Sequence, residues 1–134
     1  MNPTQVLSAM GDMGLRYSRK EIYPAYYYIS NMINDNRVIV IYKDLLPVAV
    51  ITFSFCNNYE PFLQKGTWDY KPHEPNGLIL YIEKMVSIGW NREIRKDFEY
   101  KISELYPNFE IAVWHRWAKW GDRKVIAKRR MNYV

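Results

Sequence analysis

Residues that bind metals or form cross-links are scarce in this sequence. The 134 residues include one cysteine, Cys56, and two histidines, His73 and His115. A single cysteine excludes an internal disulfide, and so few thiols and imidazoles argue against a zinc site. We therefore expect a fold that holds no metal ion.

Long apolar runs are also missing. No run in the chain approaches the roughly 20 apolar residues that a membrane-crossing helix needs. The chain does not open with a basic segment followed by an apolar stretch, which a secretory signal would require. We therefore expect no membrane span and a cytoplasmic location, in a cell or in an infected host.

Aromatic residues, by contrast, are abundant. The sequence contains 12 tyrosines, 5 tryptophans and 5 phenylalanines. Apolar residues make up 49% of the chain and charged residues 25%, as in globular proteins, and the length suits one core. We predict a single domain, 1–134, in which some aromatic side chains line a groove or an interface.

The order of the predicted elements indicates an α+β fold. Helices are expected to begin near Asn2, at a capping box that starts with Ser18, and at Asn91, the last one ending before Pro107. Strands are expected at 37–42, 47–55, 78–87, 110–114 and 124–128, with a long loop at 56–76 and a Trp-rich turn at 116–122. The first two strands form an antiparallel hairpin, and a strand–helix–strand crossover follows. The prediction is a mixed, mostly antiparallel sheet with helices packed on it.

The stretch 78–106 is the predicted functional unit, because a helix begins directly after a buried strand. The first turn of such a helix presents unpaired N–H groups and the positive end of the helix dipole, which together attract phosphate. The residues expected to receive a phosphate or pyrophosphate are those of the connecting loop: Val86, Ser87, Ile88, Gly89, Trp90, Asn91 and Arg92.

This arrangement resembles the fold of the GCN5-related N-acetyltransferases, and most closely the RTX-toxin-activating lysine acyltransferases. The matching motifs lie between Tyr23 and Arg129. They are Tyr23-Pro24, the hairpin 41–52 with Leu46-Pro47-Val48-Ala49, Tyr81-Ile82-Glu83 running to Ile88-Gly89, Leu105-Tyr106-Pro107, Ile111-Ala112-Val113 and 121–125. The resemblance implies an acetyltransferase-like sheet that moves an acyl group from acyl-CoA or acyl carrier protein to a protein amine. It also implies that the carrier's pantetheine lies between the two strands that flank the long helix.

Three residues are candidates for catalysis. Glu83 matches an aspartate in the central strand of the activators and is predicted to take a proton from the attacking amine, since a protonated amine cannot attack a thioester. The alternative is a structural carboxylate paired with an arginine or a lysine. Lys20 or its neighbours stand where the activators have an essential histidine, with a solvated residue at the start of a helix as the alternative. His115 is a second candidate base, with a half-buried histidine hydrogen-bonded to backbone as the alternative.

Tryptophans and basic residues alternate near the C-terminal end. The net charge of +5 is accounted for by Lys119, Arg123, Lys124, Lys128, Arg129 and Arg130 together with Asp122. Trp114, Trp117, Trp120 and Arg123 are predicted to bind a partner. Tryptophan and arginine are enriched in protein interfaces, and no nucleic-acid-binding motif accompanies them, so a protein acceptor or assembly partner is favoured over nucleic acid.

Two functions remain open from the sequence. The first is an acyltransferase that uses Glu83 as its base. The second is a non-catalytic binding or structural module with the same fold, such as a phage or viral accessory or virion protein. The missing histidine and the single glycine in the loop that follows the third predicted strand favour the module, whereas Glu83 and the strand–loop–helix unit favour the enzyme.

Overall fold

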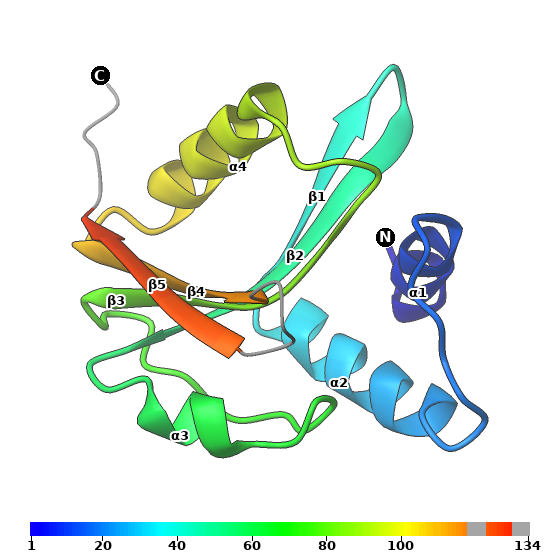
Figure 1. The fold of residues 1–134 in the computed structure, drawn as a ribbon, viewed down its shortest axis with the longest axis horizontal. Coiled ribbons are helices and arrows are strands. Elements are labelled where there is room, and N and C mark those ends of the chain that lie inside the picture. Colours follow the sequence, from blue (N-terminus) through cyan, green and yellow to red (C-terminus); the bar gives the residue numbers. More distant parts are fainter. Residues whose placement is uncertain (118–122, 130–134) are drawn as a thin grey trace.

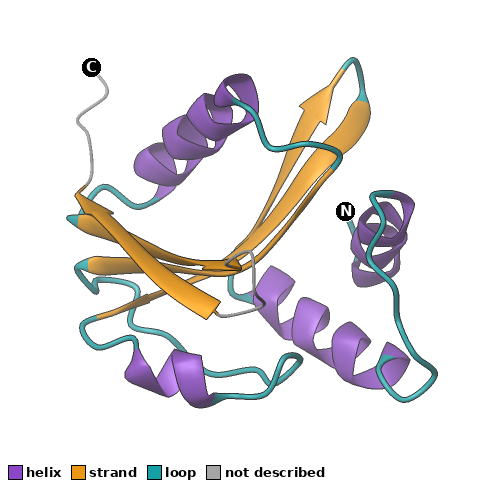
Figure 2. Ribbon diagram, viewed as in Figure 1, coloured by secondary structure: helices purple, strands orange, loops and turns teal. Residues whose placement is uncertain are grey.

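The computed structural model describes the backbone of residues 1–117 and 123–129 and the side chains of residues 1–115. The helices are α1 (Pro3–Asp12), α2 (Ile22–Asn34), α3 (Glu60–Gln64) and α4 (Arg92–Leu105). The strands are β1 (Val38–Lys43), β2 (Leu46–Cys56), β3 (Ile79–Ser87), β4 (Ile111–Trp117) and β5 (Arg123–Arg129). Figure 2 shows these helices around a central sheet, so the predicted α+β class is confirmed for the described residues.

The strands form one mixed sheet in the order β1-β2-β3-β4-β5. Neighbouring strands are antiparallel except β3 and β4, which are parallel and joined through α4. A parallel pair needs a crossover of this length, because the chain must return to the same end of the sheet. The predicted hairpin and the predicted single crossover are both confirmed.

The hairpin of β1 and β2 is built from β-branched residues and closed by a tight turn. Asp44 and Leu45 both adopt positive φ, at 51° and 69°, as the central residues of a primed turn do. The register shifts once between Ile41 and Tyr42, and β2 shifts against β3 between Thr52 and Phe53. The second shift matters for the site, because it lies beside Glu83.

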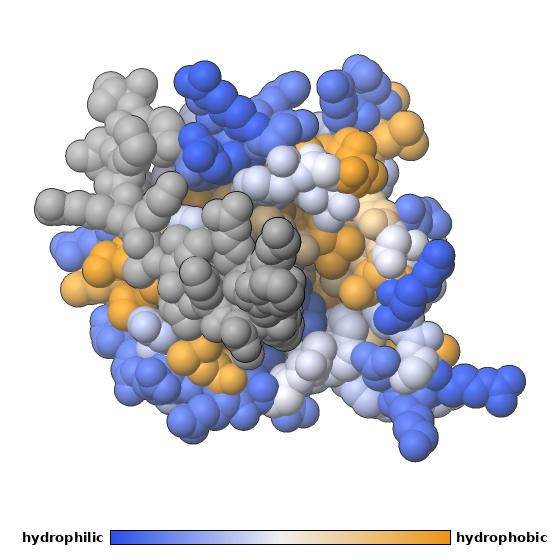
Figure 3. All heavy atoms as spheres, viewed as in Figure 1, coloured by the Kyte–Doolittle hydropathy of each residue, from blue (hydrophilic) through white to orange (hydrophobic). Residues whose placement is uncertain are grey.

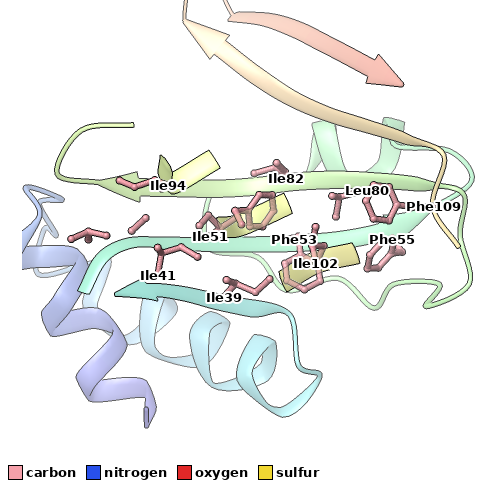
Figure 4. Close-up of a cluster of buried hydrophobic side chains, with 13 residues drawn as sticks. Ile39, Ile41, Ile51, Phe53, Phe55, Leu80, Ile82, Ile94, Ile102 and Phe109 are labelled. Carbon is pink, nitrogen blue, oxygen red and sulfur yellow. The ribbon is translucent and has the colours of Figure 1, made fainter. Parts of the chain in front are cut away.

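Helices cover both faces of the sheet. Three apolar residues of α4, Ile94, Phe98 and Ile102, pack against one face, and Figure 4 shows their cluster with the side chains of β1, β2 and β3. The other face packs against α1, α2 and α3, and Figure 1 places these three helices opposite α4. Because the sheet is covered on both faces, the sequences of β2 and of the first half of β3 are nearly continuous apolar runs.

Three expectations need correction. The helix predicted from Ser18 begins at Ile22, because only half of the capping box forms: Ser18 N–H donates to Glu21 Oε1 at 3.2 Å. The predicted loop 56–76 contains the short helix α3. The proline in this segment is compatible with a helix because it lies in the first turn. The predicted turn 116–122 starts too early, since 116–117 pair with β5, and its remaining residues lie outside the described part of the chain.

Candidate functional site

Glu83 lies in β3 at the point where the register with β2 shifts. Ile82 pairs with Phe53 and Lys84 pairs with Thr52, so Glu83 occupies the irregularity between them. The neighbouring Ile82 belongs to the cluster under α4, and Glu83 therefore points to the opposite face, toward α2. Its side chain is 2% exposed, so the carboxylate is buried in the molecule.

Two cations and two hydroxyl groups surround this carboxylate. Arg37 Nη2 lies 3.1 Å from Oε2, and Lys65 Nζ lies 2.8 Å from Oε1. Tyr28 donates its hydroxyl hydrogen to Oε1 at 3.2 Å, and the Ser54 hydroxyl donates to Oε2. A buried charge needs such partners, because each lost interaction with water must be replaced inside the protein.

Arg37 is fully buried in this network, with 0% of its side chain exposed. Its Nε donates to the Phe53 carbonyl at 3.0 Å, and its Nη1 donates to the Lys71 carbonyl at 2.9 Å and to Asp35 at 3.2 Å. Its guanidinium also lies 5.3 Å from the centre of the Tyr70 ring. Sequence reasoning missed Arg37. Its one signal was a charged residue directly before the β-branched run of β1.

Tyr28 joins the network from α2 and is itself 1% exposed. Its hydroxyl shares a hydrogen bond of 2.8 Å with Thr52. Burial, followed by the charge of Glu83, raises the pKa of Tyr28 well above its usual value, so this phenol stays protonated and acts as a donor. The ammonium groups of Lys65 and Lys84 lie 5.0 and 5.7 Å from the centre of its ring.

The strands that flank α4 diverge next to Glu83. The parallel pairing of β3 and β4 covers three residue pairs and ends at Tyr81 and Val113. Beyond that point β3 pairs with β2 as far as Ser87, and β4 pairs with β5 as far as Trp117. Figure 4 shows β4 turning away from β3. Glu83 is two residues past the last pair, about 7 Å along the strand at the usual rise per residue.

The predicted phosphate loop is only partly assembled at the start of α4. Asn91 caps the helix as predicted, its Oδ1 accepting the Ile94 N–H at 2.9 Å. Trp90, Asn91, Arg92 and Arg95 line a hollow of about 280 Å³. The other predicted loop residues are used by the fold, since Val86 packs against the α1–α2 cluster, Ser87 pairs with Ala49, and Ile88 N–H donates to Val48. Gly89 has open space around the position of a Cβ atom.

The other candidate catalytic residues lie apart from this network or at its margin. Lys20 is exposed in the turn before α2, and among the described side chains it is not one of those that surround Glu83. His115 on β4 is hydrogen-bonded through Nε2 to the hydroxyl of Tyr81, a side chain rather than backbone. Cys56 is buried, and burial raises the pKa of its thiol to about 11, which argues against a nucleophilic role.

The predicted partner-binding set is described only in part. Trp114 is half-buried and packs against the core cluster under α4, so it is not a freely exposed anchor. The backbones of Trp117 and Arg123 pair with each other across β4 and β5. Their side chains, and Trp120 as a whole, lie outside the described part of the chain.

Comparisons with known proteins add no relatives. No protein-family model matches the chain, and no curated protein matches it significantly. Within residues 1–117 and 123–129, no group of three or more histidine, cysteine, aspartate or glutamate side chains is placed to hold a metal ion. In the same residues, no helix is long and apolar enough to cross a membrane.

Proposed function

We propose that the protein transfers an acyl group from a thioester carrier, acyl-CoA or acyl carrier protein, to a protein amine. The observation that carries this proposal is the divergence of β3 and β4 after three residue pairs. Two parallel strands that separate no longer pair with each other along their facing edges. The amide-containing arm of an acyl carrier can pair with such an edge, as an added strand would.

The start of α4 supports the same proposal. Phosphate groups bind well where helix N–H groups and arginine side chains converge, because arginine forms two parallel hydrogen bonds to an oxyanion. Arg92 and Arg95 line the hollow at this end of α4 together with Trp90. In the proposed reaction these two arginines bind the phosphates of the carrier.

Glu83 is the proposed base. Its carboxylate takes a proton from the acceptor ammonium group, the resulting amine attacks the thioester carbonyl carbon, and the C–S bond breaks. The proton then passes from Glu83 to the departing thiolate, and the nitrogen releases a second proton to solvent as the amide forms. Arg37 holds Oε2, so the oxygen that exchanges the proton in this scheme is Oε1, the atom now in contact with Lys65.

Calorimetric titration with coenzyme A, acetyl-CoA and an acyl carrier protein tests the proposal. We expect saturable binding that weakens by at least about tenfold when Arg92 and Arg95 are both replaced by alanine, because each replacement removes a charge-assisted hydrogen bond. Lys101→Ala, at the other end of α4, is the matched control and should bind normally. Absence of binding to all three carriers would contradict the proposal.

A second candidate is a non-catalytic binding module of the same fold. The burial of Glu83 between Arg37 and Lys65 favours it, because a buried carboxylate paired with two cations is also what a purely structural ion pair looks like. Exposed apolar residues also favour it: Leu45 is 93% exposed and Leu46 is 68% exposed at the tip of the β1–β2 hairpin. Figure 3 shows apolar surface at that end of the molecule.

Glu83→Gln separates the two candidates. If the protein is an enzyme, this nearly isosteric change abolishes transfer from acetyl-CoA to a lysine peptide while the circular dichroism spectrum is retained. If it is a module, carriers do not bind, and Leu45→Ser with Leu46→Ser weakens capture of its partner while Glu83→Gln does not.

A further inference from the structure

Lys65 carries a primary amine directly to the proposed base. The residue follows α3, and its extended backbone (φ −73°, ψ 156°) ends the helix there. Its Nζ lies 2.8 Å from Glu83 Oε1, and its side chain is 12% exposed. A lysine amine from the chain itself thus occupies the place that an acceptor amine must take in the proposed reaction.

The surroundings of this amine suit an acceptor. The ammonium lies 5.0 Å from the centre of the Tyr28 ring, and the Tyr28 hydroxyl bonds the same carboxylate oxygen. The two cations at Glu83 differ in chemistry. Arginine keeps its proton under all physiological conditions, whereas a lysine can transfer one to a carboxylate and become a nucleophile. Of the two cations, Lys65 is therefore the one whose chemistry allows it to serve as a nucleophile.

The divergence of β3 and β4 brings a donor within reach in the same scheme. Glu83 lies two residues beyond the last β3–β4 pair, on the face that carries Tyr81. In this scheme an acyl chain between the separated strands would end near that face. Lys65, whose Nζ is 2.8 Å from Glu83 Oε1, is an amine that such a donor would meet.

We propose that Lys65 is an acyl acceptor within its own chain, an inference that rests on the proposed acyltransferase function. Glu83 takes one proton from the Lys65 ammonium, and the neutral amine attacks the carbonyl carbon of the thioester. A new C–N bond forms and the C–S bond breaks; the nitrogen releases its second proton to solvent, and the proton held by Glu83 passes to the thiolate. The products are an amide at Lys65 and the free thiol carrier.

The experiment uses the full chain incubated with acetyl-CoA, followed by intact-mass measurement and peptide mapping. We expect one acetyl group per chain, located at Lys65, at a rate per molecule that does not change on dilution of the protein. Glu83→Gln should slow this labelling by at least about a hundredfold, the effect expected on removal of a general base. Lys65→Arg should abolish it, and the exposed Lys96→Arg should leave it unchanged.

The outcomes separate the inference from the function. Transfer to an added lysine peptide, with Lys65 unlabelled, overturns the inference and keeps the acyltransferase. Equal labelling of Lys65 and Lys96 indicates uncatalysed acetylation and also overturns it. Labelling of neither Lys65 nor the peptide overturns the proposed function and the inference together. Because peptide mapping is done on the unaltered chain, the result does not depend on whether a variant folds.

Discussion

At the scale of single residues, His73 in the loop before β3 is held neutral by a hydrogen bond from β2. Phe55 N–H donates to His73 Nδ1 at 3.1 Å, an interaction that requires the unprotonated nitrogen. Burial, followed by the nearby charge of Arg37, lowers the pKa of His73 from 6.5 to about 4. The native protein therefore excludes a proton that the unfolded chain accepts.

This pKa shift predicts that stability depends on pH between about 4 and 6.5. As the pH falls through this window, the unfolded state binds more protons than the native state, so the free energy of unfolding falls. Since His73 is half-exposed, we expect a loss of about 1–2 kcal/mol, less than the full shift implies. Urea unfolding at the two ends of the window measures it.

His73→Gln is the matched variant for this measurement, because glutamine can accept the Phe55 N–H but does not titrate in this range. The pH dependence should be smaller in the variant by the contribution of His73. An equal dependence in both proteins would assign the effect to other groups.

The residues around Glu83 show where sequence reasoning ends. Glu83 itself stands out because a charge in an apolar strand is unusual. Its partners do not stand out, since Tyr28, Arg37 and Lys65 come from three separate segments. They meet only because α2 packs on the sheet and α3 turns the chain back toward β3. Such contacts depend on tertiary packing, which local residue patterns do not encode.

At the scale of elements, the connection between the loop and β3 passes unusually close to β2. A Cβ atom added at Gly77 would lie 2.5 Å from the backbone nitrogen of Cys56, whereas one added at Gly89 would meet nothing within 4 Å. The two glycines flank the same strand. Gly77 is therefore required for close approach of backbone to backbone, and Gly89 is not.

We predict opposite responses to alanine at these glycines. Gly77→Ala forces β2 and the start of β3 apart and should lower the free energy of unfolding by about 1–3 kcal/mol, as overpacking does. Gly89→Ala should change it by less than about 0.5 kcal/mol, the usual range for an open surface site. Urea unfolding of both variants provides the comparison. Similar values for the two would contradict the close approach at Gly77.

Elements were predictable where their signal is local. The β-branched run of β1, the Asn91 cap and Pro107 after the last helix all act within a few residues, and the corresponding elements form as expected. The helix α3 was missed because five residues are too short for a periodic pattern. The start of α2 was misplaced because the predicted capping box forms only in part.

At the scale of the whole molecule, Arg37 links parts of the chain that are distant in sequence. It lies between α2 and β1, and its hydrogen bonds reach β2 through Phe53, the loop through Lys71 and β3 through Glu83. Loss of this one side chain would remove a donor from the carbonyl groups of Phe53 and Lys71 and leave Glu83 with Lys65 as its remaining cation. The network thus couples β2, β3 and the loop before β3.

Replacement of Arg37 should therefore destabilise the whole fold rather than one loop. Arg37→Met keeps the apolar stem but removes every donor, and breaking a buried ion pair in this way costs about 3–5 kcal/mol. That is a large share of the roughly 5–15 kcal/mol that holds a domain folded.

Arg95→Met is the control, because Arg95 is 48% exposed and its Nε lies 3.7 Å from Glu99, so its loss should cost less than about 1 kcal/mol. Urea unfolding followed by circular dichroism and by tryptophan fluorescence should give one coincident, shifted transition for Arg37→Met. Equal midpoints for the two variants would show that the buried network does not hold the sheet, α2 and the loop together.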